Sequence, residues 1–260
     1  MESGVAAGAT PRLQHQAPGR PTFELGLVGG FSLRRNGEPV HLPLSVQRLV
    51  AFLALSKRAV MRSHAAGTFW PDVSEARAMA NLRSVIWRLP GPSHEILVFD
   101  GGLIALRPDV GVDARRLSRA AHVILEATDD AGADDVEPLI DAGELLPDWS
   151  DQWVIVDREH YHQLRVHALE RLCQRRAASG RVGLAVEACL AALAAEPARE
   201  STQRQLIEIY LSEGNRADAL RQYASYRRVI RDEVGVEPSR EITDLVRAGA
   251  IVDGGRNQAR

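Results

Sequence analysis

Four polar side chains fall on one stripe of the helix that the sequence predicts over residues 74–89. Their spacing of four, three and four residues places them on one face of an α-helix: Arg77, Asn81, Ser84 and Arg88. Arginine can donate two hydrogen bonds to guanine, asparagine can bond adenine through two atoms, and serine can contact a base or a phosphate. Arg83 lies further round the same helix, beside Trp87. The four stripe residues and Arg83 are therefore candidates for reading base edges in the major groove of DNA.

A neighbouring stripe of this predicted helix is apolar, as expected of a face that packs on a domain core. Its members recur at helical spacing: Ala78, Leu82, Val85, Ile86 and Leu89. Exposed helices commonly carry arginine, so the polar stripe alone is also compatible with an ordinary solvated surface. The elements around the helix and the local charge favour a nucleic-acid contact.

The preceding residues predict three short antiparallel strands, at 23–28, 31–35 and 40–44, with a hairpin turn at Asn36-Gly37. Helical periodicity begins at Ser45, the expected N-cap, and a second helix is predicted over 62–69. After the helix at 74–89, two strands at 96–99 and 103–106 flank the turn Asp100-Gly101-Gly102. This order of strands, three helices and a terminal hairpin predicts a winged helix that carries an additional N-terminal sheet.

The charge of the chain is divided between its two halves. Residues 44–90 hold seven basic and two acidic residues, whereas residues 111–250 hold 18 basic and 25 acidic ones, within a net charge of −2. Such asymmetry is typical of one half that faces nucleic acid and one that does not. Five cations are therefore candidates for phosphate contacts, which position a protein without specifying sequence: Arg48, Lys57, Arg58, Arg62 and Arg107.

From residue 113 onward the pattern is helical, with a boundary between domains at Pro108 and Gly111. Helices are predicted over 113–127, 134–142, 151–179, 182–195, 199–212, 216–233 and 239–248. Gly180 and Gly214 are 34 residues apart, as are Ala185 and Ala219, and this period is the tetratricopeptide signature. Repeats of this kind stack into a concave surface that usually binds protein.

Several other classes of protein fit the sequence poorly. The longest apolar run, residues 49–55, is far shorter than the ~20 residues of a membrane-spanning helix. Neither a phosphate-binding Gly-rich loop followed by Lys-Ser/Thr nor a Gly-x-Ser-x-Gly motif occurs, so no enzymatic activity and no cofactor are expected. The histidines at 160, 162 and 167 do not share one helix face, which disfavours a metal site. Cys173 and Cys189 are expected to be buried thiols, and Trp149 and Trp153 to be packing anchors.

The motifs of both halves resemble one family, the Streptomyces antibiotic regulatory proteins (the SARP, or AfsR/DnrI/RedD, family). The N-terminal half carries FSL at 31–33, WPD at 70–72, NLR at 81–83 and WRL at 87–89. The C-terminal half carries ELLPDW at 144–149, DQW at 151–153, EPARE at 196–200, GNRADALRQYASY at 214–226 and EVGVEPS at 233–239. The resemblance extends from about residue 23 to residue 246, and the joint order of these motifs is highly specific.

The resemblance implies an α+β OmpR-type winged helix-turn-helix at 21–109, followed by an all-α, tetratricopeptide-like bacterial transcriptional activation domain at 111–248. A disordered leader is expected at 1–20 and a disordered tail at 249–260. The family's polymerase-contacting loop corresponds to Phe69, Trp70, Pro71, Asp72 and Val73.

The implied function is a cytoplasmic, nucleoid-associated activator that binds direct repeats near the promoter and recruits RNA polymerase holoenzyme, including its sigma factor. It would bind double-stranded DNA as a homodimer and control a biosynthetic gene cluster. The alternative is a protein-interaction scaffold built on the repeats, joined to a domain that binds nucleic acid without sequence specificity. A small effector on the concave helical surface is a third interpretation that the residues leave open.

Overall fold

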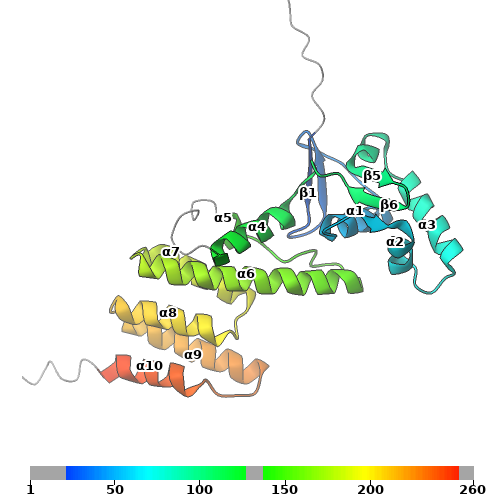
Figure 1. Cartoon of the computed structure of the whole chain (residues 1–260). Helices are drawn as coiled ribbons and strands as arrows, with labels where there is room; N and C mark the ends of the chain where they lie inside the picture. The colour runs from blue at the N-terminus through cyan, green and yellow to red at the C-terminus, as the bar shows by residue number, and fades with distance from the viewer. Residues whose placement is uncertain (1–21, 127–136, 252–260) are drawn as a thin grey trace, which may run out of the picture.

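The structure is a computed structural model that describes residues 22–126 and 137–251. The predicted leader lies outside these residues, as does the tail from residue 252 on. Figure 1 shows a sheet and three helices at one end of the molecule and a stack of antiparallel helices at the other.

The N-terminal sheet has the strand order β3-β2-β1-β7. Its strands are β1 (Phe23–Gly26), β2 (Ser32–Arg35), β3 (Glu38–Pro39) and β7 (Gly111–Val112). The predicted turn is confirmed, because Asn36 and Gly37 both have positive φ, 51° and 85°, as a two-residue hairpin requires. The third strand was predicted at 40–44, but it lies immediately after the turn and ends at Pro39. Pro39 and Pro43 have no N–H group to extend the ladder.

The three helices that follow the sheet are α1 (Leu44–Leu55), α2 (Arg62–Phe69) and α3 (Glu75–Trp87). Helix α1 begins one residue before Ser45, and Pro43 rather than Ser45 occupies its N-cap position. A 3₁₀ helix, η1 (Gly91–Ile96), leads from α3 to the wing. The wing is a sheet of order β4-β6-β5, made of β4 (Val60–Met61), β5 (Leu97–Asp100) and β6 (Leu103–Leu106). The predicted winged helix is therefore confirmed, with two short strands, β4 and β7, that the sequence pattern did not indicate.

The C-terminal half is a stack of helices, as predicted. Its elements are α4 (Asp113–Glu126), α5 (Glu137–Ile140), α6 (Gln152–Ala178), α7 (Val182–Ala195), α8 (Glu200–Ser212), α9 (Arg216–Glu233) and α10 (Arg240–Ile251). The disordered tail predicted over 249–260 was wrong at residues 249–251, which belong to α10; its remaining residues lie outside the described part of the chain. Gly249 permits a close approach of α10 to α8, since a Cβ atom there would lie 2.6 Å from Leu211 Cδ2.

The 34-residue repeat is a repeat of structure. Gly180 and Gly214 have nearly equal positive φ angles, 76° and 75°, in the left-handed conformation that ends a helix. The backbone bonds around them also match, with Arg181 N donating to Arg176 O and Asn215 N to Tyr210 O, both at 2.8 Å. Ala185 and Ala219 are fully buried inside the helices that follow, as close helix packing requires. Two equivalent helix pairs, α6/α7 and α8/α9, result.

The two cysteines form a disulfide, so the expectation of free thiols was wrong. Cys173 is on α6 and Cys189 on α7, and both side chains are fully buried. A three-residue turn joins these antiparallel helices. It brings Cys173 and Cys189, which are 16 residues apart in the sequence, to facing positions on the two helices. The two Cα atoms are 5.6 Å apart, within the range of disulfides.

An aromatic cluster joins the two halves of the molecule. It comprises Phe31, Phe52, Phe69, Trp70, Trp149 and Trp153. The ring of Trp153, in the first turn of α6, meets the rings of Phe52 on α1 and Phe69 on α2 edge to face, with centroids 5.4 and 6.0 Å away. Trp149 stacks on Phe31 at 6.1 Å. The predicted role of the two tryptophans as packing anchors is confirmed, and the surfaces that they join belong to different halves.

Hydrogen bonds reinforce this junction. The Asp113 carboxylate, at the start of α4, accepts the backbone N–H groups of Leu27 and Val28 at 2.9–3.0 Å. Arg115 donates to the carbonyl oxygens of Ala54 at 2.7 Å, Ser56 at 3.1 Å and Leu53 at 3.2 Å. These carbonyls lie at the C-terminal end of α1, where intrahelical partners are missing. One hydrophobic core accordingly runs from the N-terminal sheet into α8.

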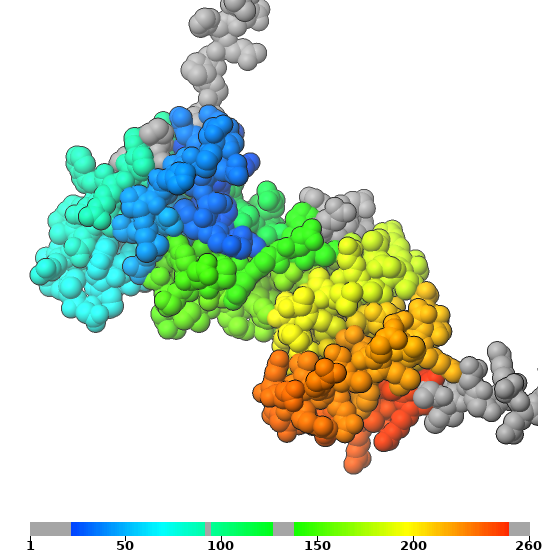
Figure 2. Space-filling model, turned by 180° about the vertical axis from the view of Figure 1, so that it is seen from behind, coloured from blue at the N-terminus to red at the C-terminus, as the bar shows by residue number. Residues whose placement is uncertain are grey.

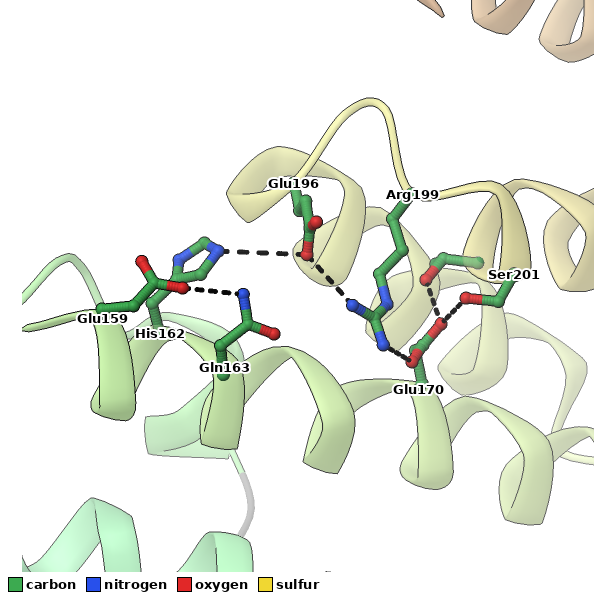
Figure 3. Close-up of polar contacts among 8 residues, drawn as sticks. Glu159, His162, Gln163, Glu170, Glu196, Arg199 and Ser201 are labelled. Carbon is green, nitrogen blue, oxygen red and sulfur yellow. Dashed lines mark hydrogen bonds and ion pairs between the residues drawn. The ribbon is translucent and has the colours of Figure 1, made fainter. Parts of the chain in front are cut away.

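A buried polar cluster fixes the turn between α7 and α8 (Figure 3). Glu170 on α6 accepts hydrogen bonds from Arg199 at 2.8 Å and Thr202 at 2.7 Å, and also from Ser201. Burial acts to raise the pKa of Glu170, but these hydrogen bonds outweigh it and hold the pKa below its ordinary value. Arg199 also pairs with Glu196 at 3.2 Å, and His162 Nε2 lies 4.0 Å from the same carboxylate. The EPARE motif at 196–200 therefore has a structural role, since Glu196 and Arg199 belong to this polar cluster.

We expect Trp153→Ala to lower the free energy of unfolding by about 3 kcal/mol, because it opens a cavity between α1, α2 and α6. Urea denaturation would measure the change. The matched control is Val156→Ala on the same helix, whose side chain is 62% exposed and should have little effect. Equal stability of the two variants would contradict the role given to Trp153.

We expect Glu170→Gln to lower the free energy of unfolding at neutral pH by about 2–3 kcal/mol, since it leaves Arg199 without its buried carboxylate. A depressed pKa in the folded state contributes stability above the unfolded pKa of ~4.3 that is lost as pH falls through the folded pKa. The difference between variant and parent should therefore shrink below about pH 4. A difference independent of pH would refute the assignment.

Candidate nucleic-acid interface

Helix α3 is amphipathic in the way that the sequence predicts. Ala78, Leu82 and Val85 are buried against α1 and α2, and Leu89 is buried just beyond the helix. Ile86, the fifth member of the predicted apolar face, is half-buried and packs at the edge of the core. This buried face fixes the rotation of α3, so the opposite face points away from the protein.

The outward face carries the predicted base-reading residues. Arg77, Arg83, Ser84 and Arg88 are exposed, and Asn81 is half-buried. Ser84 Oγ donates to Ala80 O at 3.0 Å, which leaves its lone pairs outward. In the described part of the chain, no hydrogen bond or ion pair engages the three arginines. The structure therefore brings these five residues onto one solvent-facing surface.

Trp87 belongs to the same surface, although the sequence pattern gave it no role. Its side chain is 83% exposed, which is unusual for a tryptophan. It follows Arg83 by four residues, so the two side chains share a helix face. The signal available in the sequence was this spacing, combined with the absence of Trp87 from the apolar stripe.

Helix α3 lies at the end of the molecule opposite α10, as both views show (Figures 1 and 2). The segment that contains α3 is cyan in Figure 2 and lies far from α9 and α10, which are orange and red.

The five phosphate candidates do not form one group. Arg58 is exposed without a partner among the described residues, and Lys57 is exposed beside a cavity between the two halves. Arg62 lies 5.1 Å above the Phe99 ring. Arg107 donates to Asp109 at 2.7 Å, and this hydrogen bond raises the pKa of Arg107.

Arg48 has contacts different from those expected. Its guanidinium pairs with Asp151 and lies 5.5 Å from the centre of the Phe69 ring. Asp151 is the N-cap residue of α6, so this ion pair joins α1 to the helical half. The sequence reveals the charge of Arg48 but not the acidic partner 103 residues away.

The loop between α2 and α3 divides into a buried and an exposed part. Phe69 is 9% exposed and packs against Trp153, and Trp70 is half-buried. Pro71, Asp72 and Val73 are exposed. The first two of the five residues predicted to contact a partner therefore serve the core, because their rings complete the aromatic cluster.

No helix in residues 22–126 and 137–251 is long and apolar enough to cross a membrane. Within the same residues, no three His, Cys, Asp or Glu side chains come together as a group that could hold a metal ion.

Comparison with known proteins identifies the C-terminal half directly. The family described as the bacterial transcriptional activator domain matches residues 141–248. The chain is 28% identical to the regulatory protein AfsR of Streptomyces coelicolor over 258 residues, which cover 90% of this chain and 26% of AfsR. It is 26% identical to AfsR of Streptomyces griseus over 226 residues, 83% of this chain and 23% of that protein. The chain thus spans about a quarter of the length of these curated relatives.

Among solved structures, the fold is similar to that of Mycobacterium tuberculosis EmbR, which was determined in complex with a low-affinity phosphopeptide. The TM-score is 0.66 at 20% identity, and the match covers 88% of this chain and 65% of EmbR. At this identity the likeness concerns the fold, a winged helix followed by a helical domain. Residues 141–248 thus match the bacterial transcriptional activator domain, and the chain as a whole is similar to the AfsR regulatory proteins.

Proposed function

We propose that this protein is a sequence-specific DNA-binding activator of transcription. The observation that carries the proposal is a contrast between its arginines. On α3, Arg77, Arg83 and Arg88 are exposed and have no partner within the described residues. In the helical half, most arginines are bound by the protein itself; Arg165, for example, donates to the carbonyls of Leu139 and Ile140. A row of uncompensated cations on one outward helix face is what a polyanionic ligand requires.

Helix α3 would enter the major groove, the usual position of the last helix in a helix-turn-helix domain. Arg77, Asn81, Arg83, Ser84 and Arg88 would contact base edges. Trp87 adds an exposed apolar surface of the kind that meets a thymine methyl group or a sugar. Arg58 is the leading phosphate contact. Lys57, Arg62 and Arg107 would contact phosphates only after their side chains turn away from their present neighbours.

Activation is proposed to depend on the exposed part of the α2–α3 loop, Pro71, Asp72 and Val73, and on the helical half. These surfaces would contact RNA polymerase holoenzyme, including its sigma factor, while a homodimer occupies direct repeats at a promoter in the cytoplasm. The control of a biosynthetic gene cluster belongs to the same proposal. Its support is the match of residues 141–248 to the bacterial transcriptional activator domain and the similarity to AfsR, together with the exposure of the loop.

We expect Arg83→Ala and Arg88→Ala each to weaken specific DNA binding by about 1–3 kcal/mol wherever the side chain reads a base. Fluorescence anisotropy on the direct repeats of the adjacent promoter, with a scrambled duplex as reference, measures the difference. The matched control is Arg228→Ala, which removes an exposed arginine of α9. If both α3 variants retain the fold and the parental affinity, α3 is not the reading helix.

We expect Arg58→Ala to weaken binding to all duplexes alike and to reduce the slope of log affinity against log salt by about 0.9, the loss of one phosphate contact. Arg48→Ala should leave this slope almost unchanged and should instead lower stability, because it removes the ion pair with Asp151. Titrations at several salt concentrations and urea denaturation distinguish the two. The scaffold alternative predicts equal affinity for specific and scrambled duplexes.

We expect Asp72→Ala to preserve DNA binding and to lower transcription from the target promoter severalfold. Its side chain is exposed, so the change removes a surface contact without disturbing the core. In vitro transcription with purified polymerase holoenzyme measures the effect, with Asp100→Ala at the wing tip as a second exposed aspartate. Full transcription by the Asp72 variant would exclude a polymerase contact through this carboxylate.

A further inference from the structure

A cavity of about 380 Å³ lies between the winged helix and the helical half. The C-terminal end of α1 and the following Lys57 form one wall, α4 forms a second and α6 a third. Its size falls at the lower end of sites for small molecules. Neither DNA binding through α3 nor a polymerase contact through the α2–α3 loop uses this cavity.

Positive charge predominates in the lining. Lys57, Arg115 and Arg119 are cationic, and Asp157 is the one carboxylate among the residues that line the cavity. Arg119 is exposed and forms no hydrogen bond or ion pair with any described residue. Burial, and secondarily the nearby charge of Arg119, lowers the pKa of Arg115. The two arginines therefore repel each other, and an anion between α1 and α4 would relieve that repulsion.

The Tyr161 side chain lies between this cavity and a second one that Arg165 lines. Tyr161 is 5% exposed, and its hydroxyl has no hydrogen-bond partner among the described residues. The hydroxyl oxygen is enclosed by the protein, so the ring of Tyr161 rather than its hydroxyl forms the wall of the cavity. Burial raises the pKa of Tyr161 to about 12, so the group is a donor at neutral pH. Asp157, on the same wall, is an acceptor.

We propose that this cavity binds a small phosphate monoester that also carries free hydroxyl groups. Lys57 and Arg119 would hold the phosphate, and Asp157 would accept a hydrogen bond from a ligand hydroxyl. Apolar side chains, including Leu55 and Leu164, line the rest of the cavity. Because the ligand would touch α1 on one side and α4 and α6 on the other, its binding stabilises their present arrangement.

Lys57 is the only lysine of the chain, so its reductive methylation, followed by peptide mass spectrometry, reports on this site alone. The probes are ribose 5-phosphate, ribose and inorganic phosphate, each titrated against the full-length protein. Saturable slowing of Lys57 methylation by ribose 5-phosphate, with much weaker effects of the other two, is the expected result. Equal protection by ribose overturns the phosphate requirement, equal protection by inorganic phosphate overturns the monoester, and no protection overturns the site.

Arg119→Gln should raise the concentration of ribose 5-phosphate that gives half-maximal protection by about tenfold, the effect of losing one charge-assisted hydrogen bond. The control is Arg116→Gln, an exposed arginine of the same helix that does not line the cavity. Equal behaviour of the two variants contradicts the assignment of Arg119. Circular dichroism confirms that both are folded, so that a shift in protection reports on ligand contacts.

Discussion

The packing of Trp153 against Phe52 and Phe69 is the interaction on which the rest of the arrangement depends. It fixes the first turn of α6 on α1 and α2 at ring distances of 5.4 and 6.0 Å. Three further features accompany it. Arg48 pairs with Asp151, Phe69 packs into the core at the start of the α2–α3 loop, and an open cavity lies between α1, α4 and α6. Arg48 and Asp151 are both partly buried beside this cluster, so their ion pair reinforces the same contact between α1 and α6.

This junction also explains how charge is distributed over the molecule. Arginines near the centre have defined internal tasks: Arg115 satisfies the end of α1, and Arg158 donates to the carbonyls of Leu145 and Trp149 at 2.8 and 2.7 Å. Each of these bonds stabilises a backbone group that burial would otherwise leave unpaired. The arginines of α3 lie beyond the reach of such partners. A chain with a net charge of −2 therefore presents a locally cationic helix at one end.

Periodicity predicted the long elements because it reports which face of a helix is buried, and the paired glycines at 180 and 214 marked helix ends through their backbone freedom. The two-residue strands β4 and β7 were not predictable in this way, since two residues show no alternation. The disulfide and the pairing of Arg48 depend on neighbours 16 and 103 residues away, which local pattern does not encode. In the candidate site, the outward face of α3 followed from its period, whereas the contacts of each cation required the tertiary structure.

Helix α1 is the element through which the helical half can influence α3. The carbonyl groups at its C-terminal end accept hydrogen bonds from Arg115, and its Phe52 ring packs against Trp153. Its Arg48 pairs with Asp151, the N-cap residue of α6. Helix α3 packs directly on α1, so a change in the seating of α4 or α6 reaches the outward face of α3 through one shared helix. Packed helices shift as rigid units more readily than they deform. Under the proposed function, DNA contact and polymerase contact would be coupled by geometry, since the loop that carries Asp72 connects α2, which packs against Trp153 through Phe69, to α3.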